Sequence, residues 1–201
     1  MHSYDPIAEN HGLRHDPMKA LVMPRPIGWI STLNANGKPN LAPYSFFNLV
    51  NDQPYQIMMA SNGQKDSLSN VESTGEMVFN GVSHQHLDAM NLSSLATQED
   101  EFVIAGLDKL PSTRVAPYRV AGAPWHLECV LDHIIELKSP PGKRHAMIIA
   151  TVVQVHIAAD LIQDGIIDQA SLRTIARCGY RDYADIDHLF ALDRPTDRPS
   201  R

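Results

Sequence analysis

The residues best suited to chemistry lie in one stretch, between Pro24 and Ser67. Its last part, Ser61-Asn-Gly-Gln-Lys-Asp-Ser67, combines hydroxyl groups, a glycine and a lysine directly before a predicted helix. Free backbone amides and the dipole at a helix N-terminus favour a bound anion, and Lys65 adds a positive charge. This segment therefore predicts a phosphate site. An ordinary helix start, with Lys65 in solvent and Asp66 as the cap, is the alternative.

A second candidate is Asn40-Leu-Ala-Pro-Tyr-Ser-Phe-Phe-Asn48, which places polar groups around an aromatic pair. Pro43 removes a hydrogen-bond donor from a predicted strand and so indicates a sheet edge or a bulge. Ser45 and the backbone amides after it would suit the polar edges of a flat heterocycle. A core strand with Phe46 and Phe47 buried on opposite faces is the alternative. A flat-ring site beside a phosphate site points to a phosphorylated flavin.

Motifs for several other chemistries do not occur in the sequence. It has no G-x-G-x-x-G after a strand, no P-loop, no G-x-S-x-G elbow and no H-E-x-x-H. His84-Gln-His86 is a close histidine pair, but no set of cysteines or carboxylates accompanies it, so we predict no metal site. Cys178 follows Arg177, which can favour a reactive thiolate, but no histidine adjoins it and a structural thiol is favoured.

The elements that must position these residues are mostly strands. Branched and aromatic residues predict strands at 27–33, 41–50, 56–60, 76–82, 125–136 and 146–157. Asn36-Gly37 predicts a tight hairpin turn between the first two strands. In strand 125–136 we expect Trp125 and its alternate neighbours on one face, with His126 and Glu128 on the other. Strand 146–157 is apolar enough to be buried on both faces.

Helices are predicted to be few and short. Asp66 or Ser67 can cap one that runs to Thr74 and stops at Gly75, and a second is expected at 86–95 with Leu95 facing inward. Strands with a few small helices predict a mostly β protein, an antiparallel β-barrel with short helices. A β-sandwich is the alternative.

Length and charge exclude several classes of protein. The chain has 201 residues, and we expect residues 1–201 to form a single domain with its core at about 20–185 and a mobile tail at about 193–201. A net charge of −6 argues against nucleic-acid or anionic-membrane partners, which require clustered cations. Two cysteines make no disulfide scaffold. The first residues do not resemble a signal peptide, so a cytoplasmic location is expected.

These motifs together resemble the flavin reductase-like, FMN-binding split-barrel family, in the branch that includes flavoredoxin. The resemblance extends from about residue 20 to 185. Its most specific signatures are Pro24-Arg-Pro-Ile-Gly-Trp-Ile-Ser-Thr32 and Asn40–Asn48. Shorter matches follow at Lys65–Asn70, Thr74–Asn80, Asp100–Phe102, Ala105–Leu107, Leu127–Cys129, His156, Gly165 and Ala176-Arg177.

The resemblance implies a split β-barrel of Greek-key type and a homodimer that binds FMN near its interface. By position, Ser31 and Thr32 would lie along the ribityl chain or the ring edge, and Arg25 would contact the phosphate or the partner subunit. The isoalloxazine would be bracketed by Pro43, Tyr44, Ser45, Phe46, Phe47 and Asn48. The phosphate would be held by Ser61, Lys65 and Ser67, with Asp66 as the helix cap.

The resemblance also implies an activity, NAD(P)H:flavin oxidoreduction, with NADH or NADPH as co-substrate and a partner monooxygenase or redox protein as the user of reduced flavin. His145, His156 and Tyr180 are candidates for contacts to the electron donor, and a structural role is the alternative for each. The family's usual Ala-Arg-Leu-Gly-Gly is Ala176-Arg-Cys-Gly-Tyr180 here. Two other functions stay open, an FMN-carrying electron-transfer or storage protein and a barrel that binds no flavin.

Overall fold

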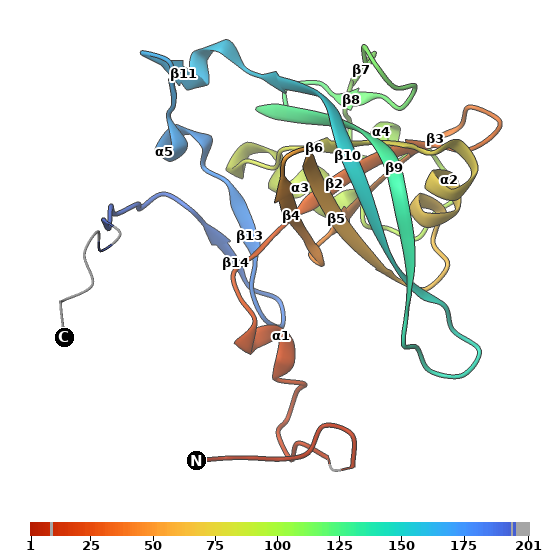
Figure 1. Cartoon of the computed structure of the whole chain (residues 1–201), viewed down its shortest axis with the longest axis vertical. Helices are drawn as coiled ribbons and strands as arrows, with labels where there is room; N and C mark the ends of the chain where they lie inside the picture. Colours follow the sequence, from red (N-terminus) through yellow and green to blue (C-terminus); the bar gives the residue numbers. More distant parts are fainter. Residues whose placement is uncertain (9, 194, 196–201) are drawn as a thin grey trace.

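The body of the molecule is a seven-stranded antiparallel sheet that curls into a split barrel (Figure 1). The computed structural model describes residues 1–8, 10–193 and 195, so most of the tail predicted at 193–201 lies outside the described residues. In spatial order the strands are β3 (Pro39–Tyr44), β2 (Gly28–Leu33), β6 (Glu76–Asn80), β9 (Trp125–Leu137), β10 (His145–Ile157), β5 (Tyr55–Asn62) and β4 (Phe47–Asp52). The mostly β fold is therefore confirmed.

Smaller elements decorate this barrel. A three-stranded sheet joins β1 (Arg25–Pro26), β13 (Ile175–Arg177) and β14 (Tyr183–Asp185), and two short hairpins pair β7 (Lys109–Leu110) with β8 (Arg119–Val120) and β11 (Ile162–Gln163) with β12 (Ile166–Ile167). The α-helices are α1 (Met18–Leu21), α2 (Asp66–Thr74), α3 (Leu87–Leu92), α4 (Glu101–Ile104) and α5 (Gln169–Leu172), and two 3₁₀ turns are η1 (His84–His86) and η2 (Ala159–Leu161). Within the described residues, no helix is long and apolar enough to cross a membrane.

The barrel interior is filled by aromatic and aliphatic side chains. The Phe79 ring centroid lies 4.4 Å from that of Phe47 and 4.9 Å from that of Trp125. Gly28 leaves room for Phe47, because a Cβ built on Gly28 would lie 2.5 Å from the Phe47 Cδ2. This contact explains the glycine in the Pro24–Thr32 signature and ties β2 to β4.

The predicted strand 41–50 is two strands, and the expectation of one continuous strand was wrong. β3 ends at Tyr44 and β4 begins at Phe47. The two residues between them carry the chain from one edge of the seven-stranded sheet to the other, so the backbone must turn there. Pro43 lies on edge strand β3, as its missing N–H predicts.

The two long strands differ from expectation in what covers their faces. On β10, Ala146, Ile148 and Ala150 are buried but the alternating residues are only half-buried or exposed, so burial on both faces was wrong. On β9, His126 and Glu128 lie on the expected opposite face, yet both are buried. The loop after β7 covers Glu128 on β9, because the Thr113 and Arg114 N–H groups donate to its carboxylate.

The helices lie about where the sequence predicts them, but their caps and divisions differ from the prediction. Gly75 ends α2 with a φ of 72°, as predicted. The N-cap of α2 is Lys65, whereas Asp66 is the first helical residue and makes no side-chain cap, so the predicted cap was wrong. The segment predicted as a helix at 86–95 splits into η1 and α3, and Leu95 is exposed.

Candidate functional site

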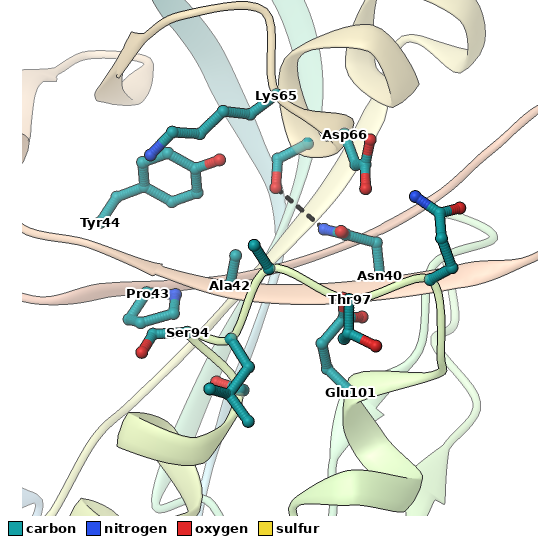
Figure 2. A pocket seen from close by; sticks show the side chains of 14 residues that line it. Asn40, Ala42, Pro43, Tyr44, Lys65, Asp66, Ser94, Thr97 and Glu101 are labelled. Atoms are coloured by element: carbon teal, nitrogen blue, oxygen red, sulfur yellow. Dashed lines mark hydrogen bonds between the residues drawn. The ribbon is translucent and has the colours of Figure 1, made fainter.

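A cavity of about 510 Å³ lies between edge strand β3, the N-terminus of α2 and the segment that follows α3. This volume is within the range of small-molecule sites. Figure 2 shows Lys65 and Asp66 on one side of the strand and Ser94, Thr97 and Glu101 on the other. The lining residues are Asn40, Ala42, Pro43, Tyr44, Lys65, Asp66, Ser67, Ser93, Ser94, Leu95, Ala96, Thr97, Gln98 and Glu101.

The N-terminus of α2 presents uncapped amides to this cavity. The first helical hydrogen bond runs from the Ser69 N–H to the Lys65 carbonyl (3.0 Å), so the N–H groups of Asp66, Ser67 and Leu68 precede it. The buried Ser67 hydroxyl accepts a hydrogen bond from the amide nitrogen of Asn40 (2.9 Å; Figure 2). This end of the helix therefore has the donors that an anion requires.

Tyr44 forms one wall of the cavity. Its ring lies 5.5 Å from the Lys65 ammonium. Burial raises the pKa of its hydroxyl, against the opposing effect of hydrogen bonds with the Ser67 and Ser61 hydroxyls. Ser61 also donates to the Gly63 carbonyl (2.8 Å). Tyr44 thus stays protonated, and its hydroxyl is hydrogen-bonded to Ser61 of β5 and Ser67 of α2.

Two carboxyl groups line this cavity together with Lys65. Asp66 is exposed, while Glu101 is buried and accepts a hydrogen bond from the Leu41 N–H (3.1 Å). Burial raises the pKa of Glu101, which favours its neutral form. An anion here would rely on Lys65 and the helix amides rather than on a strongly positive field.

Ser31 and Thr32 lie behind the cavity and line none of its surface. Ser31 donates to the Tyr118 carbonyl and accepts from the Asn80 side chain (3.3 Å). Thr32 accepts from the Asn70 amide (3.0 Å). Both hydroxyls therefore link β2 to the elements packed against it.

The residues from Ser45 to Asn48, predicted to surround the flavin ring, lie in different surroundings. Ser45 lines a second cavity of about 270 Å³. Phe46 is half-buried with the Lys19 ammonium 6.0 Å from its ring, and Phe47 lies in the core. Asn48 is exposed, and its side-chain oxygen accepts from the Leu49 N–H (2.9 Å).

Arg25 is buried away from the Lys65 cavity. Its guanidinium donates to the carbonyls of Lys19 (2.6 Å), Val22 and Cys178 (2.9 Å). These bonds fasten α1 to the turn after β13. Its Nε has no hydrogen-bond partner among the residues that the structure describes.

The three residues predicted for donor contacts lie apart from one another. His145 and His156 are at opposite ends of β10, which places them roughly 36 Å apart along an extended strand. His156 Nε2 lies 2.6 Å from the buried Glu128 carboxylate. The Tyr180 ring packs against His15 (5.6 Å between centroids). Among the described residues, no group of three or more His, Cys, Asp or Glu could hold a metal ion.

Some lining residues were missed by sequence reasoning. Asn40 begins the Asn40–Asn48 signature, but nothing in the sequence indicates that its side chain meets that of Ser67. Glu101 and the segment 93–98 come from much later in the chain, and their polar, small residues are typical of any loop. The Lys38 ammonium holds this segment by donating to the Gln98 carbonyl (2.6 Å).

Comparisons with known proteins agree with this architecture. The family model described as "Flavin reductase like domain" matches residues 18–174. A protein from Halalkalibacterium halodurans is 35% identical over 183 residues, which are 87% of this chain and 88% of the relative.

Two solved structures are similar over nearly their whole length. Nitrilotriacetate monooxygenase component B from Bacillus cereus has a TM-score of 0.88 and 26% identity, over 96% of this chain and 98% of that one. The 2-nitrobenzoate 2-nitroreductase NbaA from Pseudomonas fluorescens has a TM-score of 0.82 and 29% identity, over 91% of both chains. Split-barrel flavin reductases and flavoredoxins share the fold at lower identity. The chain therefore belongs to the flavin reductase-like family of split-barrel proteins, and its function is oxidoreduction with a flavin as cofactor or substrate.

Proposed function

We propose that the protein binds FMN and catalyses NAD(P)H:flavin oxidoreduction. The observation that carries this proposal is the cavity at the uncapped N-terminus of α2, where Lys65, Ser67 and backbone amides face one another. In a chain of the flavin reductase-like family, this arrangement suits the phosphate that distinguishes FMN from riboflavin.

The residues present fit such a ligand in two respects. Donors for a phosphate lie at one end of the cavity, at Lys65 and Ser67. The other end leads to Ser45, because the second cavity, which Ser45 lines, shares Pro43 and Ser94 with the first. Ser45 and Phe46 form the turn between β3 and β4, the Ser45–Phe46 corner. Flavin bound here would supply the hydride acceptor, and the protein's part would be to fix the ring, expose one face and position the nicotinamide donor.

The phosphate end can be tested by comparing FMN with riboflavin. Ser67→Ala should weaken FMN binding about tenfold, since one hydrogen bond to a charged group is lost, and leave riboflavin binding within about twofold. Ser73→Ala is the matched control, because Ser73 is an exposed serine at the other end of α2. Fluorescence titration of the flavin gives both dissociation constants. Equal losses for FMN and riboflavin would contradict a phosphate contact at Ser67.

We also propose a homodimer with the flavin cavity near its interface. Apolar side chains are exposed on edge strand β4, at Leu49 (53%) and Val50 (50%), and the outer face of β10 is only partly covered. The N-terminal segment up to α1 extends away from the barrel (Figure 1), and Leu21 and Val22 on it are exposed. Sedimentation should give a species of twice 22.3 kDa; a monomer at micromolar concentration would contradict the dimer.

The user of the reduced flavin is proposed to be a partner monooxygenase. Support comes from the similarity to nitrilotriacetate monooxygenase component B, which extends over 96% of this chain. An FMN-carrying electron-transfer protein is the second outcome of the same biochemical test, and it would hold FMN without reacting with NADH or NADPH.

A further inference from the structure

A chain of three cavities leads from the α2 terminus to a pair of arginines. The second cavity, about 270 Å³, shares Pro43 and Ser94 with the first. The third, about 400 Å³, shares Asn91, Arg177 and Tyr183 with the second and adds Arg181. An elongated ligand could therefore reach from the proposed flavin ring to these arginines.

Arg177 is held in place by its neighbours and keeps donors free. It is the last residue of β13 and pairs with Tyr183 of β14. Its guanidinium carbon lies 4.4 Å from the Tyr183 ring centroid, and one terminal nitrogen donates to the Tyr180 carbonyl (2.7 Å). Stacking fixes the guanidinium plane, and the remaining N–H groups of Arg177 have no protein acceptor within the described residues.

Arg181 adds a second, uncompensated positive charge. It lies on a turn closed by hydrogen bonds from the Cys178 N–H to the Asp182 carbonyl (3.0 Å) and from the Asp182 N–H to the Gly179 carbonyl (2.9 Å). Its side chain is exposed and makes no hydrogen bond or ion pair with the described residues. Asp88 is the acidic residue lining the same cavity, so the arginines outnumber the carboxylates there in a chain whose net charge is −6.

We propose that Arg177 and Arg181 bind a phosphate of the nicotinamide dinucleotide while its nicotinamide lies on the flavin. Guanidinium groups match phosphate geometry through paired N–H donors, and the Tyr183 stack pre-orients one of them. The inference rests on the proposed oxidoreductase function. It places that phosphate of the nicotinamide dinucleotide in the third cavity, away from the site at Lys65.

Equilibrium binding of the donor's phosphate-bearing half tests this assignment without turnover. The probes are ADP-ribose, which carries the pyrophosphate of NADH and NADPH, and ADP-ribose 2′-phosphate, which adds the phosphate particular to NADPH. Both are titrated calorimetrically into protein saturated with FMN. Arg181→Gln should raise the dissociation constant of at least one probe about tenfold, because a charge-assisted contact is lost.

Arg114→Gln is the matched control, since Arg114 is also exposed, its guanidinium has no protein partner in the described chain, and it lines none of the three cavities. A loss for the 2′-phosphate probe alone assigns the arginines to that phosphate, and a loss for both assigns them to the pyrophosphate. Unchanged binding in Arg181→Gln, an equal loss in Arg114→Gln, or no binding of either probe by the wild type would overturn the proposal. If the wild type binds a probe through Arg181 yet oxidises neither nucleotide, the proposed oxidoreductase function fails and the phosphate site stands.

Discussion

Replacing Gly28 by alanine should strain the barrel next to the Ser45–Phe46 turn, where we propose that the flavin binds. The new methyl group would lie 2.5 Å from Phe47 Cδ2 and 2.7 Å from Cγ. Carbon atoms pack at about 3.5–4.0 Å, so the ring must move by about 1 Å. Phe47 is 7% exposed and packed on Phe79, which leaves little space for that movement.

Overpacking of this kind costs about 1–3 kcal/mol of unfolding free energy. Because Phe47 directly follows the Ser45–Phe46 corner, the same shift should weaken FMN binding. Urea denaturation measures the first effect and flavin titration the second. The FMN effect is expected to be smaller than the loss of stability, since the corner can adjust partly.

A double-mutant cycle isolates the contact. Phe47→Ala alone should cost about 3–5 kcal/mol, but Gly28→Ala in that background should cost less than about 1 kcal/mol, because the ring that it meets is gone. A coupling energy near zero, or a Gly28→Ala protein as stable as the wild type, would refute the packing explanation for the glycine.

Three further predictions concern charge and backbone conformation. Burial, and to a lesser extent the charge of Arg119, lowers the pKa of His126 from 6.5 to about 4. The free energy of unfolding should therefore fall by about 3 kcal/mol as the pH drops from 6.5 toward 4. Urea titrations of the wild type and His126→Asn should diverge over this range, and parallel curves would contradict a buried neutral imidazole. Burial raises the pKa of Glu101 in the folded protein. Its protonated form therefore stabilises the fold fully below the ordinary carboxyl pKa, and this stabilisation is lost as the pH rises through the raised pKa. The melting temperature of Glu101→Gln, measured from pH 4 to 8, should lack this decline. Tyr180 has a φ of 52°, so Tyr180→Gly should be about 1 kcal/mol more stable to urea than Tyr180→Ala, and an equal stability would argue against backbone strain there.

Local features of the chain were predictable because they depend on neighbouring residues. Alternation and β-branched residues located the main strands. Gly75 marked the end of α2 because glycine readily adopts the positive φ, 72°, that ends the helix there. Pro43 indicated a sheet edge for the same kind of local reason, its missing donor.

Features that depend on distant residues were not predictable. The turn at Ser45–Phe46 arises because β3 and β4 lie at opposite edges of one sheet, and nothing within the segment itself requires a break. The floor of the cavity likewise comes from Glu101, which meets the Leu41 backbone only in the folded chain. The burial of Glu128 depends on the Thr113 and Arg114 amides that bind its carboxylate (2.9 and 2.6 Å).

The visible absorbance of the protein loaded with FMN, recorded without oxygen before and after adding NADH or NADPH, tests the central claim most directly. We expect FMN to bind in a stoichiometric complex and its visible band to bleach when at least one of the two nucleotides is added. A protein that binds FMN but is bleached by neither nucleotide would contradict the oxidoreductase and favour an electron carrier. A protein that binds no FMN would contradict the assignment of the α2 cavity itself.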